Sequence, residues 1–210
     1  MEEQNVPKEV KDHYEKAQIA VDRKNYTYAI ELLTHAINIK PDFARARQLL
    51  RMAEVKLLEK HPPGFLKRII NFVYSCFHTF IAMFNETKGN YHDAIAIYED
   101  ILRNDPKNGL VLLKLGILLK LEGMEESAMV TLESAVEQAK NSAAGYGLLG
   151  ELHSNLGNYE RARQCFKKVL QIKPTDHAAE RGLKNLDALT TIDKSFDKTK
   201  QNLNIREITE

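Results

Sequence analysis

Residues 149–174 of the chain read LGELHSNLGNYERARQCFKKVLQIKP. Gly157 in this stretch is followed five residues later by Ala162 and nine residues later by the bulky Phe166, and the stretch closes on Pro174. Glycine tolerates the left-handed backbone that ends many helices, whereas proline cannot continue a helix. The stretch therefore predicts two helices joined by a tight turn, with a small residue where the helices approach each other.

The pattern recurs upstream at a fixed interval of 34 residues. Each set of equivalent positions has a physical reason: a glycine ends the first helix, a small residue lies at the helix contact, and a bulky residue follows one helical turn later. The sets are Gly89, Gly123 and Gly157; Ala94, Ala128 and Ala162; Tyr98, Leu132 and Phe166; Gly116 and Gly150; and Leu115 and Leu149. A period of this length predicts an array of stacked helical pairs.

These residues make the chain resemble the tetratricopeptide-repeat family. The signature is fullest at 157–174 and recurs as Gly89-Asn90-Tyr91 with Pro106. It is weaker at 123–140, where Lys140 replaces the proline, and in an early copy at 25–41, where Lys24 replaces the glycine. The resemblance implies an all-α fold, a right-handed solenoid of stacked antiparallel helix pairs.

The repeat boundaries divide the chain into segments. We expect an atypical segment before the clear repeats, a capping helix with a soluble outer face after them, and a polar tail too poor in apolar residues to fold alone. The expected segments are a flexible N-terminus at 1–9, a first repeat at 10–43, a degenerate repeat with the start of a long apolar helix at 44–74, repeats at 75–108, 109–142 and 143–176, a capping helix at 177–189, and a disordered tail at 190–210.

The period slips inside the atypical segment. Ala29 and Ala94 are 65 residues apart, three short of two periods. Residues 65–84 read FLKRIINFVYSCFHTFIAMF, with no helix breaker. We therefore expect one helix at about 65–88, roughly 36 Å long against roughly 21 Å for an ordinary repeat helix.

Three interpretations of this apolar helix are open. It packs on residues 44–60 or on the early repeat, as an all-round apolar helix usually does. Alternatively, it mediates self-association or binds a partner. In the third interpretation it lies in or on a membrane: Lys67 and Arg68 precede the apolar run 69–84, which is shorter than a span and contains Asn71 and His78. The residues for the last two roles are Phe65, Leu66, Ile69, Ile70, Phe72 and Val73.

Composition and motifs argue against chemistry and nucleic acid. Thirty basic side chains balance 29 acidic ones, so the basic footprint of a nucleic-acid-binding protein is missing. The seven histidines show no zinc-ligand spacing. Cys76 and Cys165 lie in apolar helical patterns and are expected to be buried. We expect no enzymatic activity, no metal or other cofactor, and a cytoplasmic location.

The family resemblance places a partner-binding groove on the first helix of each repeat. Carried onto this chain, the groove residues are Tyr14, Gln18, Met83, Leu110, Leu113, Lys114, Ile117, Lys120, Leu121, Glu151 and Asn155. Some relatives grip a terminal carboxylate with Lys, Asn and Arg, but here Tyr14, Gln18 and Leu110 occupy places in that set. An apolar groove with lysines suits an amphipathic helix or an extended apolar peptide, unless Leu110 and Leu113 merely pack on the long helix.

The sequence thus predicts a protein-interaction scaffold that binds a peptide or helix of another protein. The alternative is a membrane-peripheral assembly factor, or a self-associating scaffold, that uses residues 65–84. Homo-oligomerisation is left open.

Overall fold

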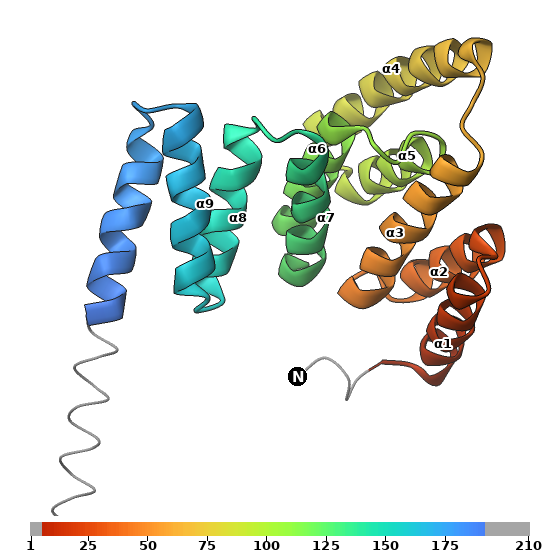
Figure 1. The fold of residues 1–210 in the computed structure, drawn as a ribbon, viewed down its shortest axis with the longest axis horizontal. Coiled ribbons are helices and arrows are strands. Elements are labelled where there is room, and N and C mark those ends of the chain that lie inside the picture. Colours follow the sequence, from red (N-terminus) through yellow and green to blue (C-terminus); the bar gives the residue numbers. More distant parts are fainter. Residues whose placement is uncertain (1–5, 192–210) are drawn as a thin grey trace, which may run out of the picture. The chain divides into compact units, whose positions relative to one another are not determined.

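The computed structural model describes residues 6–191, and all regular structure within them is helical. The helices are α1 (Lys8–Asp22), α2 (Tyr26–Ile39), α3 (Ala44–Lys60), α4 (Phe65–Thr87), α5 (Tyr91–Asn104), α6 (Gly109–Leu121), α7 (Glu125–Gln138), α8 (Ala143–Asn155) and α9 (Tyr159–Ile172), followed by a helix at 177–191 (Figure 1). The predicted all-α class is confirmed. Of the expected flexible N-terminus, residues 8 and 9 are already helical; the expected tail at 190–210 lies outside the described residues from 192 onward.

The glycines of the repeat end helices as predicted. Gly89, Gly123 and Gly157 have φ angles of 77°, 76° and 74°. Lys24, which replaces the glycine in the early copy, has the same left-handed conformation with a φ of 57°. A side chain in this region is sterically costly, so the early copy forms the same turn with a backbone strain that glycine would not have.

The chain forms two compact units, Met1–Lys140 and Asn141–Glu210. In the first unit, α1 packs on α2, α4 on α5, and α6 on α7, while α5 also packs on α6. In the second unit, α8 packs on α9, and Phe166 of α9 contacts both α8 and the helix at 177–191. Stacked helix pairs therefore build both units.

Close helix contacts depend on small residues at one position of each pair. A Cβ atom on Gly116 would lie 2.6 Å from Leu132 Cγ. In the second unit, a Cβ atom on either Gly150 or Gly182 would lie 2.7 Å from the ring of Phe166. This ring is thus held between two helices, which explains why glycine recurs there.

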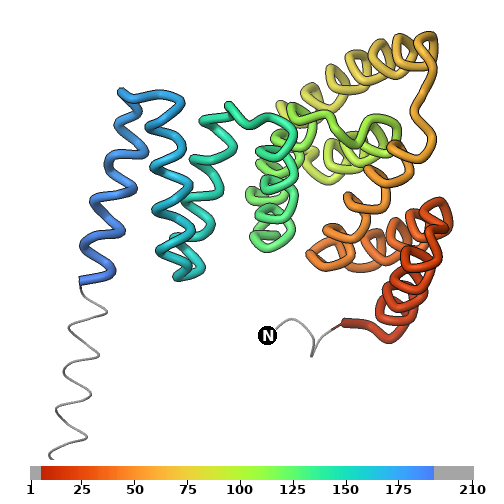
Figure 2. The backbone as a smooth tube through the Cα atoms, viewed as in Figure 1, coloured from red at the N-terminus to blue at the C-terminus, as the bar shows by residue number. Residues whose placement is uncertain are grey.

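The helix α3 departs from the regular stacking. It packs on α2 and, across a long stretch of sequence, on α7. Its Arg47 and Arg51 form ion pairs with Glu99 of α5. Through α3, the early repeat therefore contacts α5 and α7, the second helices of two later repeats. The helix α5 thus contacts α3 as well as α4. Figure 2 shows the chain leaving α3 and crossing to the start of α4.

The ion pairs of α3 are buried. Arg47 is fully buried, and Arg51 and Glu54 are each 4% exposed. Arg51 Nη1 lies 2.9 Å from Glu54 Oε2. Burial lowers the pKa of Arg47 to about 9, and it raises the pKa of Glu54 against the attraction of Arg51. Buried charges remain tolerable only while they are paired, so these contacts hold α3 in one place.

Candidate functional site

The side of α4 that faces the protein is polar. Asn71 Nδ2 donates to the Asn104 carbonyl oxygen at 3.2 Å, and the Tyr74 hydroxyl donates to Asp100. Ser75 Oγ accepts a hydrogen bond of 3.2 Å from Asn108 Nδ2. Hydrogen bonds to α5 and to the start of α6 therefore fix which way α4 is turned.

Further along α4, the inward side remains short or polar. The His78 ring stacks on Tyr74 with 3.7 Å between ring centroids, and Ala82 is fully buried. Glu86 accepts from the Tyr98 hydroxyl and lies 3.4 Å from Lys114 Nζ. Burial, and then the bond to Glu86, raises the pKa of Tyr98 far above its ordinary value.

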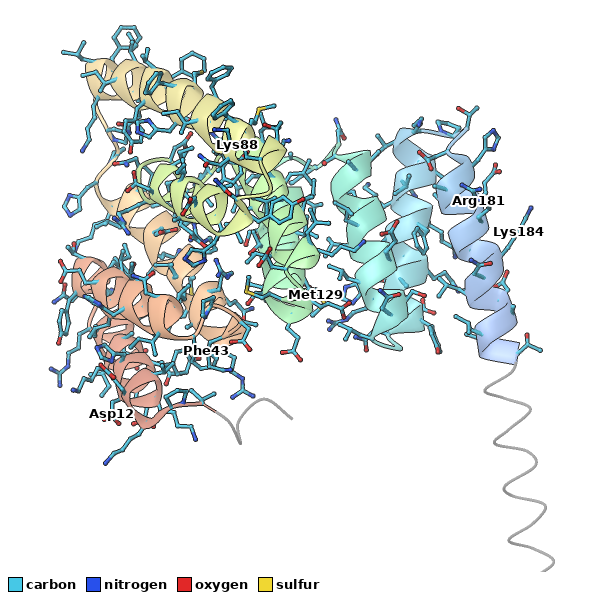
Figure 3. The ribbon with its side chains drawn as sticks, turned by 180° about the vertical axis from the view of Figure 1, so that it is seen from behind. Asp12, Phe43, Lys88, Met129, Arg181 and Lys184 are labelled. Carbon is cyan, nitrogen blue, oxygen red and sulfur yellow. The ribbon has the colours of Figure 1, made fainter. Side chains whose placement is uncertain are left out.

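The opposite side of α4 is apolar and exposed. Phe65 is 79% exposed and Phe80 72%. The exposed apolar side chains of the helix are Phe65, Leu66, Ile69, Ile70, Phe72, Val73, Phe77, Phe80, Met83 and Phe84. Figure 3 shows side chains, several of them rings, projecting from α4 away from α5. Apolar patches of this extent on soluble proteins mark interaction sites.

The repeat period shows how unusual this arrangement is. Phe84 is 54% exposed, whereas Leu118, its equivalent 34 residues later in α6, is 2% exposed. Leu118 belongs to a helix that packs on the preceding α5 as well as on α7. The helix before α4 is α3, which packs on α2 and α7 instead, so this face of α4 is left uncovered.

The interpretation that residues 65–74 pack on 44–60 or on the early repeat is wrong. All six apolar side chains singled out there are between 45% and 79% exposed. The physical reason is that Asn71, Tyr74 and Ser75 supply the contacts to α5 and α6. The expectation of two buried cysteines fails for the same reason at Cys76, which is exposed on α4. Cys165 is partly buried.

Seven of the predicted groove residues lie on α4 and α6. We call them the α4–α6 surface: Met83, Leu110, Leu113, Lys114, Ile117, Lys120 and Leu121. Leu110 is 62% exposed and Leu121 61% exposed, so Leu110 does not merely pack on the long helix. Leu113 and Ile117 are partly buried. The pair Glu86–Lys114 joins α4 to α6 beneath this surface.

The other predicted groove residues lie elsewhere. The Tyr14 ring packs edge-on against Phe43 at 5.2 Å, and it lines a hollow between α3 and α7. Gln18 donates to the Tyr14 hydroxyl at 3.4 Å. Glu151 and Asn155 belong to the second unit, where they line a hollow bounded by α8, α9 and the helix at 177–191. The first unit thus groups only the α4 and α6 members of the predicted set.

Sequence reasoning missed two groups of residues. Phe77, Phe80 and Phe84 continue the apolar side of α4 beyond residue 74. Their spacing of three and four residues was the available signal, since such positions share one helical face. The buried pair Arg47 and Arg51 carried the same four-residue signal, but only the fold reveals their partner on α5.

Among residues 6–191, no group of three or more His, Cys, Asp or Glu side chains is placed to hold a metal ion. Within the same residues, no helix is both long and apolar enough to cross a bilayer.

The paired helices, the glycine-ended turns and the 34-residue period define a helix–turn–helix repeat protein. Tetratricopeptide-repeat family profiles match residues 87–152 and 143–176. Residues 87–176 are therefore tetratricopeptide repeats.

Sequence relatives share part of the chain. It is 28% identical over 92 residues to the ER membrane protein complex subunit 2-A of Xenopus laevis, covering 44% of this chain and 31% of that protein. It is 30% identical over 88 residues to tetratricopeptide repeat protein 7A of Homo sapiens, covering 42% of this chain and 10% of that protein. The chain therefore spans less than a third of the length of these relatives.

Solved structures share the fold. The TPR domain of P58(IPK) matches with a TM-score of 0.58 at 16% identity, over 92% of this chain and 59% of that one. The first TPR domain of Spaghetti (RPAP3), bound to the HSP90 peptide SRMEEVD, matches with a TM-score of 0.53 at 18% identity, over 56% of this chain and 93% of that one.

Proposed function

We propose that this protein is an interaction scaffold, not an enzyme, and that it binds a segment of another protein on the α4–α6 surface. The observation that carries the proposal is the exposure of Leu110 and Leu121 at 62% and 61% on a repeat helix whose inner side is fully packed. Exposing these two leucines does not stabilise the fold, so their exposure favours a role in recognition. The first helix of a tetratricopeptide repeat is also where the family binds its partners.

The chemistry of this surface selects the class of partner. Leu110, Leu113 and Ile117 offer apolar contacts, and two lysines lie beside them: Lys114, which is paired with Glu86, and Lys120. An amphipathic helix, or an extended apolar peptide with acidic residues at its edge, complements that combination. The cytoplasm is the compartment we propose for this interaction.

A terminal carboxylate is not the feature that we expect this surface to recognise. The Spaghetti domain was solved with SRMEEVD, an acidic peptide. In this chain Leu110 stands beside Lys114 where a second polar residue would be needed, and Tyr14 is packed on Phe43. We therefore expect SRMEEVD to bind this protein no better than a scrambled peptide.

The test is affinity capture with the full chain and a matched variant. Leu110→Glu with Leu121→Glu changes two exposed side chains, so folding should be preserved, and the loss of anchoring contacts should reduce partner capture about tenfold or more. Ile39→Glu, which alters a 44% exposed side chain on α2, is the control and should capture partners as the unmodified protein does. Equal capture by the double variant would refute the assignment.

A further inference from the structure

We propose that the outer face of α4 binds the surface of an anionic lipid bilayer, with the helix lying flat on it. The outer face of α4 is defined by Phe65, Leu66, Ile69, Ile70, Phe72, Val73, Phe77, Phe80 and Phe84. This inference does not rest on the proposed function, because none of these nine residues belongs to the α4–α6 surface, whose one member on α4 is Met83.

The polarity of α4 is inverted. Its hydrogen-bonding side chains Asn71, Tyr74 and Ser75 are used up in contacts with α5 and α6. The helix cannot turn its apolar side inward without breaking these bonds and burying polar groups elsewhere, which is costly. The apolar side is thus held toward the outside by the fold itself.

The outer face of α4 is also long and wide. The helix has 23 residues where α6 and α8 have 13, so the face runs roughly 34 Å. At 3.6 residues per turn, its apolar residues cover about half of the circumference, which is wider than the stripe that a single packed helix needs. A continuous apolar medium matches such a face better than one partner helix does. Interfacial helices have this amphipathic form, with aromatic side chains on the buried side.

Positive charges lie near both ends of α4. Lys67 and Arg68 are exposed near the start of α4, and Lys88 follows its end, with Nζ 4.3 Å from the centre of the Phe84 ring. Residues 65–85 contain no Asp or Glu. Glu86, the first acidic residue, is turned inward to Tyr98 and Lys114. These cations lie near both ends of an exposed apolar helix, and long basic side chains beside an apolar face can reach anionic headgroups.

The same charges disfavour a second copy of the chain as the occupant. In a parallel pair of α4 helices, the ends that carry Lys67 and Arg68 would lie side by side. In an antiparallel pair they would meet Lys88. Like charges placed together oppose association, whereas a lipid surface carries the opposite sign.

The chain contains no tryptophan, so single tryptophans can report on each face. The full-length variants Phe72→Trp and Phe80→Trp keep an aromatic ring at exposed positions. Mixed with vesicles of phosphatidylcholine and phosphatidylserine, both should shift their emission to the blue. Ile39→Trp on α2 should not shift. Unchanged emission of the two α4 variants would overturn the proposal, as would an equal shift with Ile39→Trp.

Vesicle flotation then tests the two parts of the surface. Lys67→Gln with Arg68→Gln should weaken partitioning into the same vesicles about 30-fold, since each surface cation contributes about fivefold. Lys8→Gln with Lys11→Gln on α1 is the charge-matched control and should partition like the unmodified protein. Phe72→Glu with Phe80→Glu should abolish flotation, while far-ultraviolet circular dichroism shows that the helices are retained.

Three results would overturn the proposal. The first is no flotation of the unmodified protein. The second is equal binding to phosphatidylcholine alone, which would remove the role of charge. The third is a lipid-independent dimer in sedimentation that Phe72→Glu with Phe80→Glu dissociates, which would make a second copy the occupant. Leu110→Glu with Leu121→Glu should keep vesicle binding, so a failure of the scaffold proposal remains distinguishable from a failure of this one.

Discussion

The helices α4 and α6 occupy the same place in successive repeats, yet their large apolar residues face opposite ways: into the core in α6 and outward in α4. In α6, Leu112 and Leu119 are fully buried. The equivalent residues of α4, 34 positions earlier, are His78 and Asn85, while its large apolar residues point outward. The repeat register thus depends on the small residue at the helix contact, Ala82 in α4 and Gly116 in α6, and not on where the apolar residues fall.

The difference follows from the helix that precedes each of them. The helix α6 follows a complete helix pair and packs between α5 and α7. The helix α4 follows α3, whose buried arginines are paired with Glu99 on the other side of α5. The ion pairs that hold α3 there are therefore part of the reason that α4 is exposed. Removing them should disturb the difference between α4 and α6 the most.

The largest effect is expected at Glu99. Glu99→Gln would leave the buried Arg47 without its paired carboxylate and Arg51 with Glu54 alone, and breaking a buried pair in this way costs about 3–5 kcal/mol. Chemical denaturation of the full chain measures the loss. Glu59→Gln, which removes an exposed partner of Lys56 and Lys107, should leave the free energy of unfolding unchanged. A Glu99→Gln protein as stable as the Glu59→Gln protein would show that α3 is not held by these pairs.

The next effect sharpens the comparison of α4 with α6 directly. Leu118→Ala should cost about 2–5 kcal/mol because it opens a cavity in a packed core. Phe84→Ala, at the equivalent position of α4, should change stability by no more than about 0.5 kcal/mol because its ring is half exposed. Urea denaturation of both variants measures the two losses of unfolding free energy. Equal losses would mean that Phe84 is buried in solution.

A smaller effect is expected where Phe166 is held in the second unit. Gly150→Ala would place a Cβ atom 2.7 Å from a ring that Gly182 blocks from the other side. Overpacking of this kind should destabilise the protein by about 1–2 kcal/mol despite the better helix propensity of alanine. Gly147→Ala is the control on the same helix, since no atom lies within 4 Å of its added Cβ. That variant should be unchanged or up to about 1 kcal/mol more stable, and thermal melts compare the two.

The smallest effect concerns pH. His153 is buried at the position equivalent to Leu119 of α6, and burial, followed by the charge of Arg161, lowers its pKa in the folded protein. Because the unfolded chain binds the proton more readily, the contribution of His153 to stability is present above the ordinary histidine pKa of about 6.5 and declines as the pH falls below it. His153→Leu should reduce the loss of stability between neutral and mildly acidic pH. An unchanged pH profile in urea denaturation would contradict this.

Much of the repeat could be predicted from the sequence because its signals are local. The left-handed glycines, the small residues at helix contacts and the length of the 65–87 helix each follow from a few neighbouring residues. The position of α3 could not be predicted, because Arg47 and Arg51 meet Glu99 across about fifty residues of sequence. The division at Lys140 also left no signal, since the period runs through it unbroken.

The candidate site was predicted only in part for the same reason. Leu110 and Leu121 are exposed on α6, in keeping with a groove. Tyr14 was carried over from the repeat pattern alone, and it lies instead in the hollow beside α3 because the early repeat leaves the regular stack. The apolar composition of 65–84 suggested burial, and only the hydrogen bonds of Asn71, Tyr74 and Ser75 show which side of the helix faces inward.

Thiol reactivity at two adjacent positions tests the orientation of α4 most directly. Cys76 is exposed, whereas Ser75 is 6% exposed and accepts a hydrogen bond from Asn108. In a Cys165→Ser background, Cys76 should react with a thiol reagent nearly as fast as in the unfolded chain. With Ser75→Cys and Cys76→Ser, the new thiol should be strongly protected until the protein unfolds. A protected Cys76 beside a reactive thiol at position 75 would contradict the orientation of α4, with its polar side inward and its apolar side exposed.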